Sequence, residues 1–104
     1  MEVLFFHTDL RDYIDALDEG THARVYKTIG LLEQFGYHLG LPQSRAMGNG
    51  LFELRIRGKH EVRKFYAFFH KQAVLLHAYI KKSQKTPVNE LQIALNRKKQ
   101  LTGI

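Results

Sequence analysis

The residues with the greatest capacity for chemistry are cations in the second half of the chain. Residues 51–104 hold twelve Lys and Arg against three Asp and Glu, a net charge of +9, whereas residues 1–50 hold four against seven, a net charge of −3. A basic excess confined to one half is typical of a surface that binds a polyanion, of which nucleic acid is the commonest. A solvated basic face that serves solubility alone is the alternative interpretation of this charge.

Five of these cations are spaced so that they meet at one rim of a sheet. They are Arg55, Arg57, Arg63, Lys81 and Lys82. The apolar patterns predict three strands over 51–57, 61–70 and 73–82, joined by connections short enough for hairpins. In such an antiparallel meander, the end of the first strand, the start of the second and the end of the third lie at the same rim. Like charges on neighbouring strands repel unless a polyanion neutralises them, which favours an anion site here.

The sequence argues against several other kinds of site. It has no cysteine, and neither of its serines stands in the G-x-S-x-G turn of a hydrolase triad. Six histidines are present, but no two are three or four residues apart, as a zinc site on a helix requires. His70 and His77 fall on neighbouring predicted strands and could lie close together, with packing favoured over metal binding. No apolar segment is long enough to span a membrane and no signal peptide is visible, so we expect a cytoplasmic protein.

The first half is predicted from apolar spacing and from residues that start and stop helices. A short strand is expected over 2–6, followed by a helix that begins at Thr8, whose side chain can cap it, and ends at Gly20. A second helix begins near Thr21. It ends where a stretch rich in glycine, 36–50, is expected to form a loop.

These elements predict an α+β fold in the order β-α-α-β-β-β-α. A last helix begins at Pro87, so a small, antiparallel-rich sheet carries an N-terminal helical hairpin and a C-terminal helix. The length of 104 residues suits one domain, and we expect residues 1–104 to form it.

Four segments of the second half form a combination that points to a known family. They are Leu51-Phe-Glu-Leu-Arg55, Arg63 followed by Tyr66, Leu75-Leu-His-Ala-Tyr-Ile-Lys-Lys82, and Thr86-Pro87. In this combination the chain resembles the phage-derived HigB-like branch of the RelE/ParE superfamily, the toxins of type II toxin–antitoxin modules. The resemblance covers nearly the whole chain, with its specific part within residues 50–95, and it implies a RelE-like fold.

The resemblance also implies an activity, the cleavage of mRNA, commonly on the ribosome and without a metal or cofactor. In RelE-type sites the 2′-hydroxyl attacks the adjacent phosphate, so the site needs a base, an acid, and cations for the developing charge. The catalytic residues that it implies are Arg55, Arg63, Lys82 and Glu53, with Glu53 as a candidate general base. Further cations are expected to contact the RNA, namely Arg57, Lys59, Lys81 and Lys85.

The identity of the acid and the base stays open at this point. Several relatives use a Tyr or His in the C-terminal segment for proton transfer, and residues 83–104 contain neither. Either another residue replaces this Tyr or His in proton transfer, with Glu53, His77, Tyr79 and Lys82 as the candidates, or the nuclease is weak. Glu53 also has a second interpretation, as a solvent-facing strand glutamate without a catalytic role.

The partner that the resemblance implies is an antitoxin that neutralises the toxin, in this branch usually a helix-turn-helix protein. Two other functions compete with the nuclease. One is a ParE-like toxin that poisons DNA gyrase, and the other is an RNA-binding module without chemistry. Arg55, Arg63 and Lys82 together favour the nuclease, since the gyrase-directed relatives generally lack that cationic set.

Overall fold

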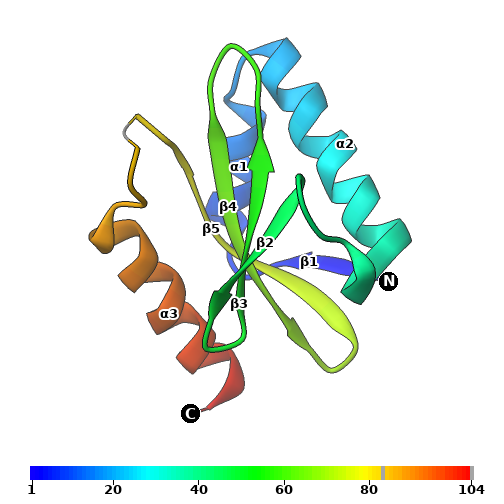
Figure 1. Cartoon of the computed structure of the whole chain (residues 1–104), viewed down its shortest axis with the longest axis vertical. Coiled ribbons are helices and arrows are strands. Elements are labelled where there is room, and N and C mark those ends of the chain that lie inside the picture. The colour runs from blue at the N-terminus through cyan, green and yellow to red at the C-terminus, as the bar shows by residue number, and fades with distance from the viewer. Residues whose placement is uncertain (83, 104) are drawn as a thin grey trace.

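A five-stranded mixed sheet forms the centre of the computed structural model, which describes residues 1–82 and 84–103. The spatial order of its strands is β1-β5-β4-β3-β2 (Figure 1). The strands are β1 (Val3–Phe5), β2 (Ser44–Gly48), β3 (Leu51–Ile56), β4 (Val62–Phe69) and β5 (Gln72–Ile80). The helices are α1 (Thr8–Asp15), α2 (Glu19–Phe35), a 3₁₀ turn η1 (Gly36–His38) and α3 (Val88–Thr102). The prediction of an α+β fold with an antiparallel-rich sheet is confirmed.

The three strands of the predicted meander pair as expected. β4 lies between β3 and β5 and is antiparallel to both. This register places Arg55 opposite Arg63, and Arg63 in turn opposite Tyr79. On its other side β5 pairs with β1 in parallel, which makes the sheet mixed. Arg55 and Arg63 therefore lie on adjacent strands, and Lys81 and Lys82 directly follow the third strand.

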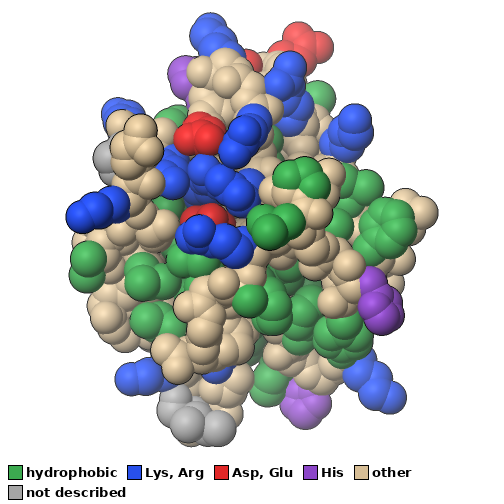
Figure 2. Space-filling model, in the orientation of Figure 1, with side chains coloured by type: hydrophobic (Ala, Val, Ile, Leu, Met, Phe, Trp, Pro, Cys, Tyr) green, Lys and Arg blue, Asp and Glu red, His purple; other side chains and the backbone are tan. Residues whose placement is uncertain are grey.

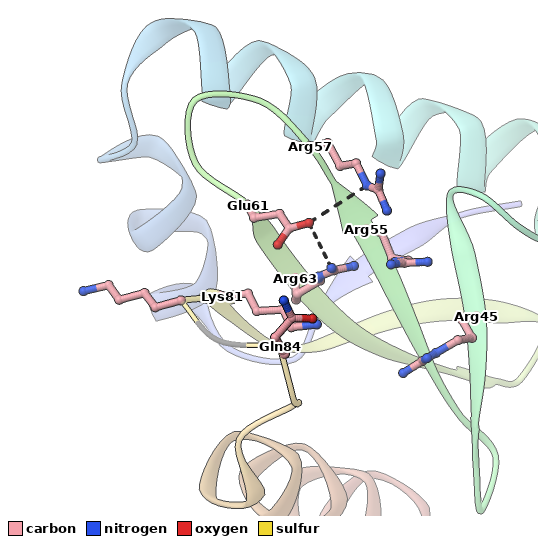
Figure 3. A pocket seen from close by; sticks show the side chains of 8 residues that line it. Arg45, Arg55, Arg57, Glu61, Arg63, Lys81 and Gln84 are labelled. Carbon is pink, nitrogen blue, oxygen red and sulfur yellow. Dashed lines mark hydrogen bonds and ion pairs between the residues drawn. The ribbon is translucent and has the colours of Figure 1, made fainter.

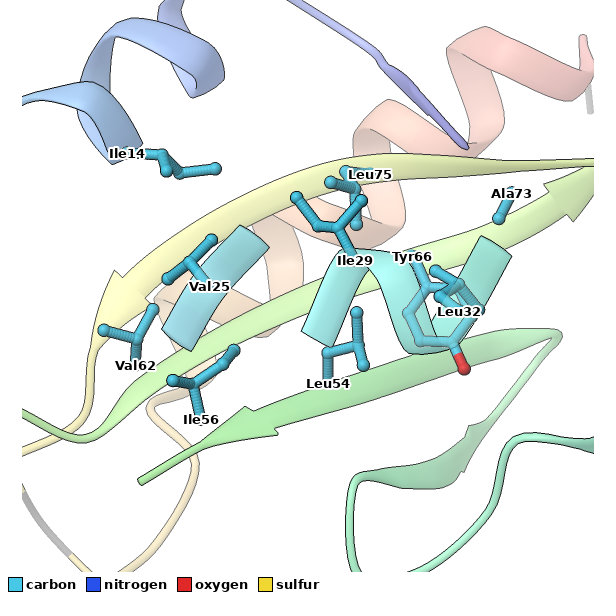
Figure 4. Packing of buried hydrophobic residues seen from close by; sticks show 10 residues of the cluster. All are labelled: Ile14, Val25, Ile29, Leu32, Leu54, Ile56, Val62, Tyr66, Ala73 and Leu75. Carbon is cyan, nitrogen blue, oxygen red and sulfur yellow. The ribbon is translucent and has the colours of Figure 1, made fainter. Parts of the chain in front are cut away.

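Helices cover both faces of the sheet, and strand alternation decides which residues face which helix. On the side of α1 and α2, the core consists of Ile14, Val25, Ile29, Leu32, Leu54, Ile56, Val62, Tyr66, Ala73 and Leu75 (Figure 4). On the other side, α3 contributes Ala94 to a second cluster that contains Phe65 and Leu76. Because successive side chains of a strand point to opposite faces, Glu53 and Arg55 project to the α3 side.

The helices begin at or close to the predicted residues, and α1 begins at Thr8 as expected, but the capping residues differ from those predicted. The α1 helix is capped by His7, whose ring Nδ1 accepts a backbone hydrogen bond, and not by Thr8. Gly20 does not end this helix but lies in α2, because Asp18 caps α2 by accepting a hydrogen bond from the backbone of Thr21 at 3.2 Å. In the described residues, no helix combines the length and apolar character that crossing a bilayer requires.

The prediction of a loop over 36–50 was wrong, because the segment contains the short turn η1 and the edge strand β2. β2 pairs antiparallel with β3 and places Arg45 opposite Glu53. A tight turn then follows, in which Gly48 and Gly50 have φ angles of 91° and 73° that favour glycine. Two of the four glycines that suggested a loop thus belong to the β2–β3 hairpin.

Candidate active site

A cavity of 610 Å³ opens on the side of the sheet that carries α3. Six cationic side chains, one carboxylate and one amide line it: Arg45, Arg55, Arg57, Arg63, Lys81, Lys82, Glu61 and Gln84 (Figure 3). They come from β2, β3, the connection between β3 and β4, the start of β4 and the segment after β5. Figure 2 shows Lys and Arg side chains crowded together on this face of the molecule. A concave surface with this charge concentrates anions.

The floor of the cavity is Arg63, with Glu53 buried behind it. The two residues are only 2% and 1% exposed, and Arg63 Nη1 lies 3.8 Å from Glu53 Oε1. Within the described part of the chain, Arg63 Nη1 and Nε have no hydrogen-bond partner although they are buried. A guanidinium that is held in place and has donors to spare is well suited to bind an oxyanion.

Among the described residues that line the cavity, only Glu61 is acidic. Its Oε1 accepts a hydrogen bond from Arg63 Nη2 at 3.1 Å and lies 3.9 Å from Arg57 Nε. The side chain is 38% exposed, so it reaches the open space of the cavity. Glu61 therefore competes with an incoming anion for two guanidinium groups, and it is placed to accept a proton from a molecule bound there.

Arg45 joins the site from the edge strand β2. Its Nη2 lies 3.9 Å from Glu53 Oε1, so Glu53 pairs with Arg45 as well as with Arg63. Sequence reasoning missed Arg45 because its segment was interpreted as a loop. It also missed Glu61 and Gln84, since each lies outside the predicted pattern of alternating cations. The signal that could have found Arg45 is the hairpin turn that pairs β2 with β3.

The cavity brings together five of the eight site residues that the sequence proposes: Arg55, Arg57, Arg63, Lys81 and Lys82. Glu53 does not line the cavity, and the interpretation of it as solvent-facing was wrong, because the arginines that pair with it and the sheet around it bury its carboxylate. Lys59 is exposed in the connection between β3 and β4. Lys85 is exposed in the segment before α3. Neither of these two lysines lines the cavity.

Tyr79 of β5 lies beside this cationic group. Burial raises the pKa of its hydroxyl, and the charge of Glu53 raises it further, while Thr86 and the charge of Arg63 act in the opposite direction. Tyr79 is directly opposite Arg63 in the pairing of β4 with β5. A hydroxyl with a raised pKa keeps its proton at neutral pH, so Tyr79 is available as a donor.

His70 and His77, which could have met on neighbouring strands, lie apart in the structure. His70 lies at the turn between β4 and β5, whereas His77 is opposite Phe65 within the sheet. His77 Nε2 instead lies 2.9 Å from Glu90 Oε2 of α3. Across residues 1–82 and 84–103, no three His, Cys, Asp or Glu side chains are arranged to hold a metal ion.

A family model matches residues 12–99 of the chain, and its description is phage-derived protein Gp49-like (DUF891). The chain belongs to this Gp49-like family. The family is associated with toxin–antitoxin modules, which agrees with the character that the strand motifs imply. The Gp49-like match extends from α1 into α3 and includes every residue that lines the cationic cavity. A search of curated proteins finds no match.

Proposed function

We propose that this Gp49-like protein is the toxin of a type II toxin–antitoxin module and that it acts as an endoribonuclease on mRNA. The observation that carries the proposal is the cavity in which six cations surround one accessible carboxylate. Cations alone would serve binding. A buried arginine with unused donors beside an exposed carboxylate also meets the needs of phosphoryl transfer, which are charge stabilisation and a proton acceptor.

The reaction that fits this geometry is internal transesterification of RNA. Glu61 takes the proton of a 2′-hydroxyl, and the 2′-oxygen attacks the adjacent phosphorus. The bond from phosphorus to the 5′-oxygen breaks, and Lys82 donates a proton to that leaving oxygen. The products are a 2′,3′-cyclic phosphate and a 5′-hydroxyl, so the reaction consumes no water and needs no metal.

The arginines take different parts in this reaction. Arg63 binds the non-bridging oxygens of the phosphate through its planar fork, and Arg55, which is opposite it on β3, adds a second donor. Arg57 and Lys81 hold the flanking phosphates, as Lys59 and Lys85 do outside the cavity. Glu53 acts as a positioning residue, because its carboxylate holds Arg63 and Arg45 from behind.

The biological setting follows from the family. An antitoxin partner is expected for a toxin of such a module, and a helix-turn-helix protein is the form that the resemblance to the HigB-like branch implies. We further propose that the message is cleaved on the ribosome, so that the toxin blocks translation. Because a basic cavity attracts acidic groups, acidic side chains of the antitoxin can mask it.

Pulse labelling after induction in bacteria tests this function. We expect methionine incorporation to fall first while thymidine incorporation persists, and total RNA to gain new 5′-hydroxyl ends. Lys82→Ala is the test variant and Lys99→Ala is its matched control. Both lysines are exposed, but only Lys82 lines the cavity. Early loss of thymidine incorporation would instead favour a gyrase poison, and RNA binding without new ends would favour a module without chemistry.

A further inference from the structure

A second cavity, of 410 Å³, adjoins the cationic one, and Lys82 lines both. It lies between α1, the end of β5 and the start of α3. Its other lining residues include two tyrosines, a proline, an amide and a carboxylate, namely Tyr13, Tyr79, Pro87, Asn89 and Glu90. Of the residues that line the second cavity, the function proposed above uses only Lys82. The composition of the second cavity therefore calls for an explanation of its own.

The walls of this second cavity differ from those of the first. Aromatic and proline side chains give flat apolar surface, and Asn89 and Glu90 add polar groups that can form directed hydrogen bonds. Tyr13 is 37% exposed although it lies on α1, which packs Ile14 into the core. Tyr13 and Glu90 line the same cavity, where burial raises the pKa of the Tyr13 hydroxyl and the charge of Glu90 raises it further.

Glu90 is held in place by His77 of β5. Its Oε2 lies 2.9 Å from His77 Nε2, and its side chain is only 20% exposed. A carboxylate that is fixed in this way accepts hydrogen bonds at a defined position and donates none while it is ionised. The group that it recognises must therefore present N–H or O–H donors, and on the edge of a nucleobase these donors are N–H groups. The amide of the adjacent Asn89 can donate to an acceptor on the same ligand.

We propose that this second cavity is a nucleobase subsite that takes a guanine next to the phosphate held in the cationic cavity. Of the RNA bases, guanine presents two adjacent donors, the N1 and N2 groups, beside one acceptor, O6. Glu90 accepts from the two donors, Asn89 donates to O6, and the tyrosine rings and Pro87 contact the apolar face of the base. Lys82, which is shared by both cavities, spans the ribose and phosphate between them. This subsite rests on the proposed function, because it assumes that the ligand of the first cavity is RNA.

Binding of nucleoside 3′,5′-bisphosphates to the full chain tests the subsite without requiring catalysis. Guanosine bisphosphate and cytidine bisphosphate carry a phosphate on both the 3′- and the 5′-oxygen of the ribose, so the test holds for both directions of the strand. Isothermal titration calorimetry should show guanosine bisphosphate binding at least about fivefold more tightly, the lower end for one well-made bidentate contact. Glu90→Gln should reduce this ratio to about one, while Glu33→Gln, an exposed glutamate of α2, should leave it unchanged.

Affinity for cytidine bisphosphate that stays the same in Glu90→Gln would show that this variant keeps its fold. Equal binding of both nucleotides by the wild-type protein would overturn the subsite, and so would a guanine preference that persists in Glu90→Gln. If RNA is cleaved while the two nucleotides bind equally, only the subsite fails. If neither nucleotide binds and RNA is not cleaved, the proposed function fails and the subsite fails with it.

Discussion

Arg55 and Arg63 lie directly opposite each other on β3 and β4, so two guanidinium groups occupy one cross-strand pair. Like charges at such a position destabilise a sheet. Two carboxylates offset the repulsion, since Arg63 lies 3.8 Å from Glu53 and 3.1 Å from Glu61. Carboxylates neutralise the positive charge of the remaining cavity cations only in part. The arrangement holds two donors close together at a cost to the fold, which is typical of a site built for an anion.

Arg63→Lys is expected to lower the saturated single-turnover rate of RNA cleavage by about 10²–10³, the usual effect of losing one transition-state donor. Lysine keeps the positive charge but cannot bind two phosphate oxygens with a planar fork. The affinity for RNA should therefore change little. Rapid-quench cleavage together with filter binding of a substrate that has a 2′-deoxy group at the scissile position measures the two quantities separately.

Lys59→Ala serves as the matched comparison for that experiment. Because Lys59 is exposed and lies outside the cavity, its loss should weaken RNA binding and lower the salt dependence by roughly one phosphate contact, with the saturated rate unchanged. A rate for Arg63→Lys within about threefold of wild type, far from the loss expected for a missing donor, would show that Arg63 has a structural or binding role only.

Glu61→Gln should strengthen RNA binding and slow RNA cleavage. The substitution removes a negative charge that pairs with Arg63 and Arg57, so we expect tighter binding of the 2′-deoxy substrate. Cleavage should fall by about 10²–10⁴, the range for loss of a general base. A variant that binds RNA more tightly and still cleaves at the wild-type rate would assign Glu61 to charge balance alone.

Much of the fold was predictable because β3, β4 and β5 have strong apolar patterns. β4 is apolar on both faces along most of its length and is the central strand of the sheet. β2 was missed since it is an edge strand whose Arg45 and Ala46 are both exposed, so no alternation marks it. Its pairing with β3 is a tertiary effect. The end of α1 was misplaced for a local reason, because Asp18 caps the next helix before Gly20 is reached.

The site was predictable where it depended on strand order and unpredictable where it depended on packing. The meander alone brings Arg55, Arg63 and Lys82 to one cavity. Alternation places Glu53 on the polar face of β3, but alternation cannot show that arginine side chains from two other strands then bury it. Glu61 precedes β4 and carries no strand pattern, so only the folded chain shows that it faces Arg63.

Glu53→Gln should destabilise the fold more than it affects the proton-transfer chemistry. Glu53→Gln leaves the buried Arg63 with Glu61 as its remaining carboxylate partner, so we expect a loss below the roughly 3–5 kcal/mol of a fully unpaired buried charge, on the order of 1–3 kcal/mol. Urea denaturation should show a loss of this order relative to Glu33→Gln, and the pH profile of the cleavage rate should keep its acidic limb. A stable Glu53→Gln variant whose acidic limb has disappeared would make Glu53 the general base after all.

Lys64 gives a prediction about stability that does not involve the site. The residue lies on β4 opposite Leu54 and Ala78 and is 0% exposed. Its Nζ has no hydrogen-bond partner among the described residues. Burial lowers the pKa of this amine from 10.5 to about 7. Between these two values the unfolded chain binds a proton that the folded chain does not, so unfolding should become less favourable as the pH rises.

Lys64→Met should therefore stabilise the protein at pH 7, and its advantage over wild type should shrink as the pH is raised toward 10. The difference between the two unfolding free energies should change by at most about 1.4 kcal/mol per pH unit, which corresponds to one proton. Urea titrations at several pH values measure it, with Lys99→Met as the control at an exposed lysine. A difference that stays constant over this range would mean that the Lys64 amine titrates alike in the folded and unfolded chains, and that it reaches water in the folded protein.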